Sequence, residues 1–175
     1  MLSETMTNLR SRLFDILLGC WTALFGAIIP LVLWLDARRI RAVSRVWVSG
    51  FTGLARVIVG LGHREIGRDN RPAAPCLIVC NHQSTWETIA LIGLFPDVAI
   101  VAKEELLKIP VFGWYLRRSP MITIDRDLGT QALRRMVDGA RQALSEGRPV
   151  LLFPEGTRKS PDEPIAFKRG VELLY

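Results

Sequence analysis

Short apolar runs that alternate with helical patterns constrain the fold of this chain more than any other feature. Four such runs, rich in Val, Ile and Leu, lie at 76–80, 98–102, 120–124 and 150–153. A clear amphipathic pattern runs from Thr130 to Glu146 and is followed by Gly147 and Pro149, which end helices. Strands separated by helices are typical of α/β proteins. The sequence therefore predicts an α/β fold with a mostly parallel or mixed sheet flanked by helices.

The N-terminal region carries a long uncharged segment. No charged side chain occurs from Ile16 to Leu35. A helix of this length, at about 1.5 Å per residue, reaches roughly the 30 Å thickness of a hydrocarbon core. Trp21 and Trp34 lie toward its two ends, where interfacial anchors are common. This predicts a membrane-associated helical segment ahead of the α/β region.

Two membrane arrangements stay open. Pro30 falls inside the uncharged segment, where it can kink a helix, and a second apolar stretch from Val46 to Leu61 contains only Arg56 as a charged residue. Either one helix spans the bilayer or two linked helices dip into one leaflet. More positive charge follows the first segment than precedes it, which favours a cytoplasmic location for the remainder of the chain.

A polar joint separates these helices from the α/β region. Residues 62–75 are rich in Gly, Pro, Asn and Asp, which form turns. We therefore expect membrane-attachment helices in residues 1–62 and an α/β domain in residues 63–175. His63 lies in the joint, where we expect an exposed loop residue.

Charge and cysteine content narrow the range of partners. The net charge of +6 favours anionic partners such as phospholipid or phosphorylated substrates. The chain has no basic run interleaved with aromatic residues and no nucleic-acid motif, so nucleic acid is not an expected partner.

Three cysteines do not suit a disulfide framework, and no Cys/His set has zinc spacing. We expect no metal site.

One histidine lies where the first predicted strand gives way to a helix. His82 is a candidate general base, because a neutral imidazole accepts a proton near pH 7. Glu87 can fix its tautomer if His82 precedes the helix and Glu87 lies in its first turn. Ser84 through Glu87 also forms a capping-box sequence, which alone explains the acid. Both interpretations stay open at this point.

Basic residues follow the other predicted strands. Phe153 to Arg158 runs from a strand into a glycine-containing turn that suits an anion, particularly phosphate. Lys103 and Arg126 follow the second and third strands. In a parallel sheet these positions gather on the same side as His82. A base beside several cations indicates deprotonation of a hydroxyl group on a phosphorylated substrate.

These segments together resemble the glycerolipid acyltransferase family, most closely the bacterial-type 1-acylglycerol-3-phosphate acyltransferases. The first block of that family is similar to His82 through Glu87, although Asp is commoner than Glu at the second position. The second block resembles residues 103–126, and the third is present in full at 153–158. The segment 167–170 is similar to the one that follows the third block.

The resemblance implies an activity and roles for particular residues. His82 would be the base and Glu87 the acid that orients it. The implied phosphate contacts are Lys103, Arg126 and Arg158, and the implied acceptor pocket is shaped by Glu155, Gly156 and Thr157. The implied reaction transfers a fatty acyl group from acyl-CoA or an acyl carrier protein thioester to the sn-2 hydroxyl of lysophosphatidate. Phosphatidate forms directly, without an acyl-enzyme, a metal or a bound cofactor.

The resemblance also implies a location and leaves alternatives. It places the protein at the inner (cytoplasmic) membrane, on the phospholipid surface, with the catalytic domain on the cytoplasmic side. Another lyso-lipid or glycerol 3-phosphate is an alternative acceptor, and a non-catalytic membrane-binding module of the same fold is an alternative function. The family's fourth block, an apolar strand with a proline, has no counterpart here, so we expect the domain at 63–175 to be truncated at its C-terminus.

Overall fold

The computed structural model describes residues 2–73, 75–158, 160, 162–164, 166–168 and 170–174, the side chains of residues 2–5 excepted. Arg169, within the segment 167–170, lies outside the described residues. The chain divides into two compact units, Met1–Arg71 and Pro72–Tyr175.

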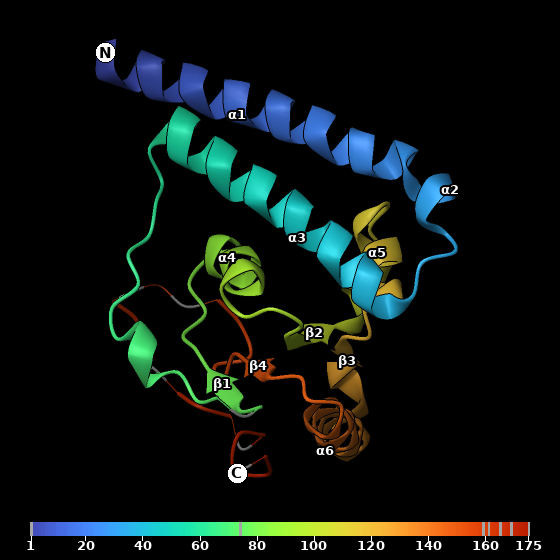
Figure 1. Cartoon of the computed structure of the whole chain (residues 1–175). Helices are drawn as coiled ribbons and strands as arrows, with labels where there is room; N and C mark the ends of the chain where they lie inside the picture. Colours follow the sequence, from blue (N-terminus) through green and yellow to red (C-terminus); the bar gives the residue numbers. More distant parts are fainter. Residues whose placement is uncertain are drawn as a thin grey trace. The chain divides into compact units, whose positions relative to one another are not determined.

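The first unit is a helical hairpin. Its helices are α1 (Leu2–Ala27), α2 (Ile29–Val32) and α3 (Ala37–Leu54), which continues into the π-helical turn η1 (Ala55–Val59). Helices α1 and α3 lie side by side (Figure 1). The indole nitrogen of Trp21 donates to the carbonyl of Trp47 at 3.1 Å. Gly50 allows this contact, because a Cβ there would lie 2.3 Å from the Trp21 indole nitrogen.

The long uncharged segment does not form one helix. Helix α1 ends at Ala27 and α2 begins at Ile29, next to Pro30, whose ring has no N–H to continue the helical hydrogen bonds. The break lies where Pro30 was noted as a possible kink, so the alternative of one unbroken helix over Ile16–Leu35 does not hold. One helix among the described residues, Ala37–Val59, is long and apolar enough to cross a membrane.

The two tryptophans of that segment differ in their surroundings. Trp34 is 89% exposed, as an interfacial anchor would be. Trp21 instead packs inside the hairpin, where its ring centroid lies 5.0 Å from that of Phe25, so an anchoring role for Trp21 stays a prediction.

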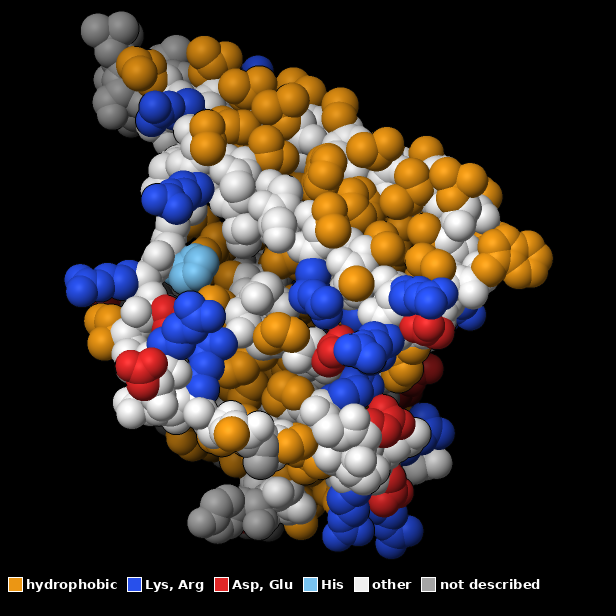
Figure 2. Space-filling model, viewed as in Figure 1, with side chains coloured by type: hydrophobic (Ala, Val, Ile, Leu, Met, Phe, Trp, Pro, Cys, Tyr) orange, Lys and Arg blue, Asp and Glu red, His pale blue; other side chains and the backbone are white. Residues whose placement is uncertain are grey.

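Large apolar side chains are exposed along α1 and α2 (Figure 2). These side chains are Met6, Leu9, Leu13, Ile16, Leu17, Leu24 and Leu31. An apolar surface of this extent is unusual for a protein that contacts water alone and marks an interaction site.

The second unit contains a four-stranded parallel sheet. Its strands are β1 (Leu77–Val79), β2 (Ala99–Lys103), β3 (Ile122–Ile124) and β4 (Val150–Leu152), in the order β1-β4-β2-β3. Every strand pair is parallel. Each strand coincides with one of the predicted apolar runs, which confirms the predicted fold class.

Helices cover both faces of this sheet, as a parallel sheet requires. Helices α4 (Trp86–Leu94), α5 (Phe112–Arg118) and α6 (Thr130–Ser145) connect successive strands, and the last confirms the predicted helix at 130–146. Short 3-10 turns lie at η3 (Glu104–Lys108) and η4 (Arg126–Leu128) in this unit, and at η2 (Arg68–Asn70) in the first unit.

Side chains alternate between the two faces of the sheet. Val101 and Val150 pack with Met136 of α6 on one face. Ile100 and Leu151 pack with Leu91 of α4 on the other. Figure 1 shows these two helices on opposite sides of the strands. Because all four strands are parallel, their carboxyl ends lie at the same edge of the sheet.

Candidate active site

A histidine and a glutamate lie in contact just after β1. His82 is in the loop between β1 and α4, and Glu87 is in the first turn of α4. The Nδ1 atom of His82 lies 2.9 Å from Oε1 of Glu87. The predicted geometry, with His82 ahead of the helix and Glu87 in its first turn, is confirmed. The glutamate side chain is long enough to reach the imidazole from this position.

The Glu87 carboxylate also holds the loop that carries His82. It accepts hydrogen bonds from the amides of Gln83 at 2.9 Å and Ser84 at 2.8 Å, and from the Ser84 hydroxyl. The Ser84 hydroxyl oxygen in turn accepts from the Trp86 amide at 3.0 Å. The bond from the Ser84 amide is one half of the predicted capping box. The Ser84 hydroxyl binds the Trp86 amide instead of the Glu87 amide, and the helix begins at Trp86 with Thr85 at its cap position. The capping and the orienting interpretations of Glu87 therefore both hold.

The ionisation of Glu87 fixes the tautomer of His82. Burial favours the neutral acid, but hydrogen bonds from the Ser84 hydroxyl, the Ser84 amide and His82 outweigh it and lower the pKa of Glu87 to about 2. An ionised carboxylate only accepts hydrogen bonds, so the Nδ1 atom of His82 carries the proton. The Nε2 atom then presents its lone pair, as a general base requires.

Two residues after β4 complete the support of His82. The ring of Phe153 stacks on the imidazole with 4.4 Å between centroids. Glu155 is only 3% exposed, and its Oε2 accepts from the backbone amide of His82 at 2.8 Å. Because β4 pairs directly with β1, Glu155 meets His82 across 73 positions of sequence, and Phe153 lies beside it.

These two contacts differ from what the sequence indicated. Glu155 was expected to shape the acceptor pocket, but its side chain holds the His82 backbone and is not among the residues that line the cavity. Phe153 was not expected at the site. The sequence contains only a weak signal that these residues support His82. They flank a proline directly after an apolar run.

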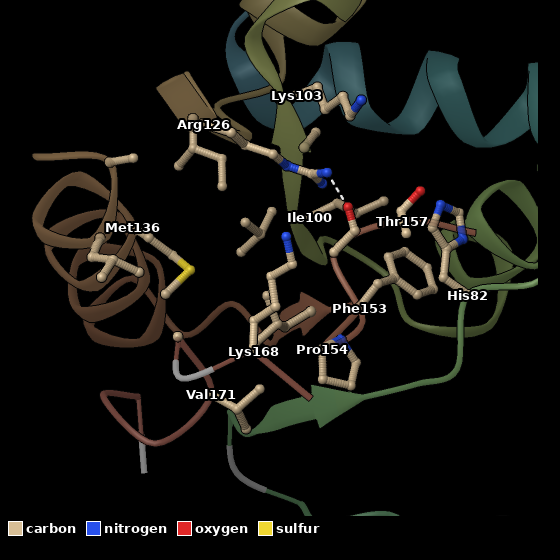
Figure 3. Close-up of a pocket in the computed structure, with 18 of the residues that line it drawn as sticks. His82, Ile100, Lys103, Arg126, Met136, Phe153, Pro154, Thr157, Lys168 and Val171 are labelled. Carbon is tan, nitrogen blue, oxygen red and sulfur yellow. Dashed lines mark hydrogen bonds between the residues drawn. The ribbon is translucent and has the colours of Figure 1, made fainter. Parts of the chain in front are cut away.

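A cavity of about 580 Å³ opens beside His82 (Figure 3). Its basic lining residues are Lys103, Arg126, Arg158 and Lys168. Gly156 and Thr157 also line it, so the structure brings together every predicted site residue except Glu155 and Glu87 around this space. Leu133, Met136 and Val171 form an apolar part of the wall. Lys168 was not predicted as a site residue; its only sequence signal was its place in the segment 167–170.

The turn after β4 is tied to the loop after β3. The Arg126 guanidinium donates to the carbonyl of Gly156, and the amide of Gly156 donates to the carbonyl of Phe153 at 3.1 Å. Gly156 has a φ of +69°, which glycine adopts without strain. Asp125 accepts from the Asp127 amide at 3.0 Å and thereby orders the start of η4. Basic and amide groups thus border the cavity on an ordered backbone.

Cys80, which precedes this loop, is a poor nucleophile. Burial, together with the nearby carboxylates of Glu87 and Glu155, raises the pKa of the Cys80 thiol. The thiol therefore stays protonated at neutral pH, and only a thiolate attacks readily.

Comparison with known proteins relates this chain to acyltransferases. The acyltransferase family model matches residues 63–173. A 1-acyl-sn-glycerol-3-phosphate acyltransferase of Pseudomonas aeruginosa is 37% identical over 175 residues, which cover 98% of this chain and 67% of that protein. A lyso-ornithine lipid O-acyltransferase of Rhizobium meliloti is 33% identical over 141 residues, which cover 81% of this chain and 46% of that protein.

A solved structure has the same fold. The 1-acyl-sn-glycerophosphate acyltransferase PlsC from Thermotoga maritima matches with a TM-score of 0.62 and 26% identity, over 93% of this chain and 69% of that one. The chain spans about two thirds of the length of the Pseudomonas protein. It spans 43% of the length of a yeast relative and 49% of that of a Helicobacter pylori relative.

Proposed function

Because the chain belongs to the acyltransferase family, we propose that it transfers a fatty acyl group from a thioester to the sn-2 hydroxyl of lysophosphatidate, giving phosphatidate for phospholipid biosynthesis. The observation that carries this proposal is the hydrogen bond between His82 and an ionised Glu87 at the edge of a cavity lined by cations. Relatives named as 1-acyl-sn-glycerol-3-phosphate acyltransferases support it.

The reaction follows from the tautomer of His82. Its Nε2 atom takes the proton of the sn-2 hydroxyl while the oxygen attacks the thioester carbonyl carbon. Glu87 stabilises the imidazolium that forms, through the hydrogen bond to Nδ1. The tetrahedral intermediate collapses, the carbon–sulfur bond breaks, and the imidazolium returns the proton to the thiolate. The products are phosphatidate and a free thiol, with no acyl-enzyme.

The basic residues give the acceptor its position. Lys103, Arg126 and Arg158 offer ammonium and guanidinium donors to the phosphate, and charged donors make the stronger hydrogen bonds. Thr157 and Gly156 line the same cavity. The apolar wall formed with Met136 suits the hydrocarbon part of a lipid. An amphiphile with an anionic head matches both parts of the cavity.

The donor and the location are part of the same proposal. The thioester comes from acyl-CoA or acyl carrier protein as a co-substrate. The chain attaches to the phospholipid surface of the inner membrane through the exposed apolar side chains of α1 and α2, with the catalytic unit on the cytoplasmic side. Sedimentation of the chain with phospholipid vesicles tests the attachment, and a chain that stays in the supernatant contradicts it.

Acyl transfer from labelled acyl-CoA to lysophosphatidate tests the reaction. We expect the His82→Ala variant to form no labelled phosphatidate above background. His63→Ala is the matched control, because His63 is exposed and lies in the other unit, and it should retain wild-type activity. Undiminished activity of His82→Ala contradicts the mechanism. Binding of lysophosphatidate without turnover by the wild type would instead indicate a non-catalytic module.

A second acceptor has some support. The Rhizobium relative is named for lyso-ornithine lipid. That acceptor lacks a phosphate group, whereas glycerol 3-phosphate and lysophosphatidate each carry one. The four basic side chains of the cavity favour a phosphorylated acceptor over lyso-ornithine lipid. Competition among lysophosphatidate, lyso-ornithine lipid and glycerol 3-phosphate for the same labelled donor separates these acceptors.

A further inference from the structure

Lys168 reaches the cavity from a segment that lies outside the three sequence blocks. Its backbone amide donates to the carbonyl of Pro154 at 2.9 Å, which fastens the segment 166–168 to the turn after β4. Its side chain lines the cavity together with His82 and Arg126. The lysine is thus held at its backbone by the same turn that carries Arg158 and supports His82.

The absence of a side chain at Gly156 opens the path of Lys168. A Cβ at Gly156 would lie 3.1 Å from both Cδ and Cε of Lys168, tighter than ordinary van der Waals contact. With glycine there, the lysine stem crosses the turn and its ammonium points into the cavity near Arg126 (Figure 3). A glycine at position 156 therefore suits both the positive φ of the turn and the close approach of the Lys168 side chain.

The ammonium of Lys168 has no anionic partner among the described residues. The carboxylates closest to the chemistry are already engaged, since Glu87 binds His82 and its loop and Glu155 binds the His82 amide. No ion pair joins the Lys168 side chain to the part of the chain that the structure describes. A lysine ammonium is a compact point charge with three donors, well suited to a phosphate oxygen.

We propose that Lys168 is a direct contact to the phosphate of the acceptor, a fourth cation beside Lys103, Arg126 and Arg158, and that Gly156 admits it. The inference rests on the proposed function, because the phosphate it binds is that of lysophosphatidate. It adds the segment 166–168 to the acceptor site and gives Gly156 a role in substrate binding.

Equilibrium binding of a labelled short-chain lysophosphatidate to the full chain tests this. The matching neutral 1-monoacylglycerol serves as the comparison ligand. Lys168→Met should raise the Kd for lysophosphatidate about tenfold and leave the Kd for the monoacylglycerol unchanged. Lys168→Arg should recover most of the affinity. Lys108→Met is the matched control, because Lys108 is exposed and lies outside the cavity, and it should bind both ligands as the wild type does.

Gly156→Ala provides a second arm. It should weaken lysophosphatidate binding by a smaller factor than Lys168→Met, because a Cβ at position 156 displaces the Lys168 side chain without removing its charge. The double variant should bind no more weakly than Lys168→Met alone, since both changes act on the same contact. An unchanged Kd in Lys168→Met, or equal losses for both ligands, overturns the role of Lys168. A wild type that does not prefer lysophosphatidate to the monoacylglycerol overturns the proposed acceptor, a result that is separate from any effect of Lys168→Met.

Discussion

The two sides of the cavity differ in how far their polar groups are satisfied within the protein. On the base side, the Nδ1 atom and the backbone amide of His82 are each hydrogen-bonded to a glutamate. On the cation side, the side chains of Lys103, Arg158 and Lys168 make no hydrogen bond or ion pair to any described residue. Arg126 is intermediate, because its guanidinium binds the Gly156 carbonyl.

This difference separates two kinds of preorganisation. The geometry of the base is set when the chain folds, so disturbing it should reduce the rate of the chemical step and the stability of the fold. Lys103, Arg158 and Lys168 are exposed and gain their partners only when an anion binds. Disturbing them should reduce affinity and leave the unliganded fold unaffected.

Removing the charge of Glu87 gives the largest expected effect. Glu87→Gln keeps the size of the side chain but can no longer stabilise an imidazolium or impose the Nδ1–H tautomer. We expect kcat to fall on the order of 10³-fold, with the KM for lysophosphatidate little changed. Steady-state kinetics on vesicles measure this. Glu87→Asp is the matched variant, since it keeps the charge and should retain more activity; equal activity of Glu87→Gln and wild type would contradict the orienting role.

Truncating Glu155 tests whether its hydrogen bond to the His82 amide keeps His82 in position. Glu155→Ala leaves the partly buried amide of His82 without its acceptor, so the free energy of unfolding should fall by about 1–3 kcal/mol. We expect kcat to fall on the order of tenfold to a hundredfold as His82 shifts. Glu155→Gln retains an acceptor oxygen and should recover much of both losses. Urea unfolding and kinetics on the same samples measure the two effects, and an unchanged stability in Glu155→Ala refutes the prediction.

Removing one cation should act on binding alone. Arg158→Met is expected to raise the KM for lysophosphatidate about tenfold with kcat within about twofold, because it removes one charged contact to the phosphate. Its unfolding midpoint without ligand should match that of the wild type. A large loss of stability in Arg158→Met would remove the contrast between the two sides of the cavity.

The pH dependence of stability gives the smallest and most specific test. The folded pKa of Glu87, about 2, lies below its ordinary value of 4.5. Its ionised form therefore stabilises the fold fully above about pH 4.5, and this contribution is lost as the pH falls toward 2. Urea unfolding between pH 2 and pH 6 should show a steeper loss in the wild type than in Glu87→Gln. Parallel curves would show that the hydrogen bonds to Glu87 do not stabilise the fold.

Local patterns were enough to predict much of this fold. The four strands and helix α6 depend on short apolar runs and helical spacing, which the chain displays within windows of a few residues. The pairing of His82 with Glu87 was also accessible, because five positions that span a loop and a first helical turn leave little freedom.

Contacts between distant segments were not predictable in the same way. Trp21 packs against Gly50 because two helices fold back on each other, and the length of the uncharged segment gave no sign of it. Pro30 was noted as a possible kink, and the structure decided that the helix ends beside it.

The sequence by itself determined the four strands, helix α6, the fold class, the placement of His82 beside Glu87, and the basic residues that follow the strands. Only the tertiary structure decided which of these groups meet. The order β1-β4-β2-β3 places the turn after β4 directly beside the loop after β1. That neighbourhood brings Phe153 and Glu155 to His82, and a later segment bound to the same turn brings Lys168. Strand order is set by packing of both sheet faces over the whole unit, a non-local balance that no short stretch of sequence encodes.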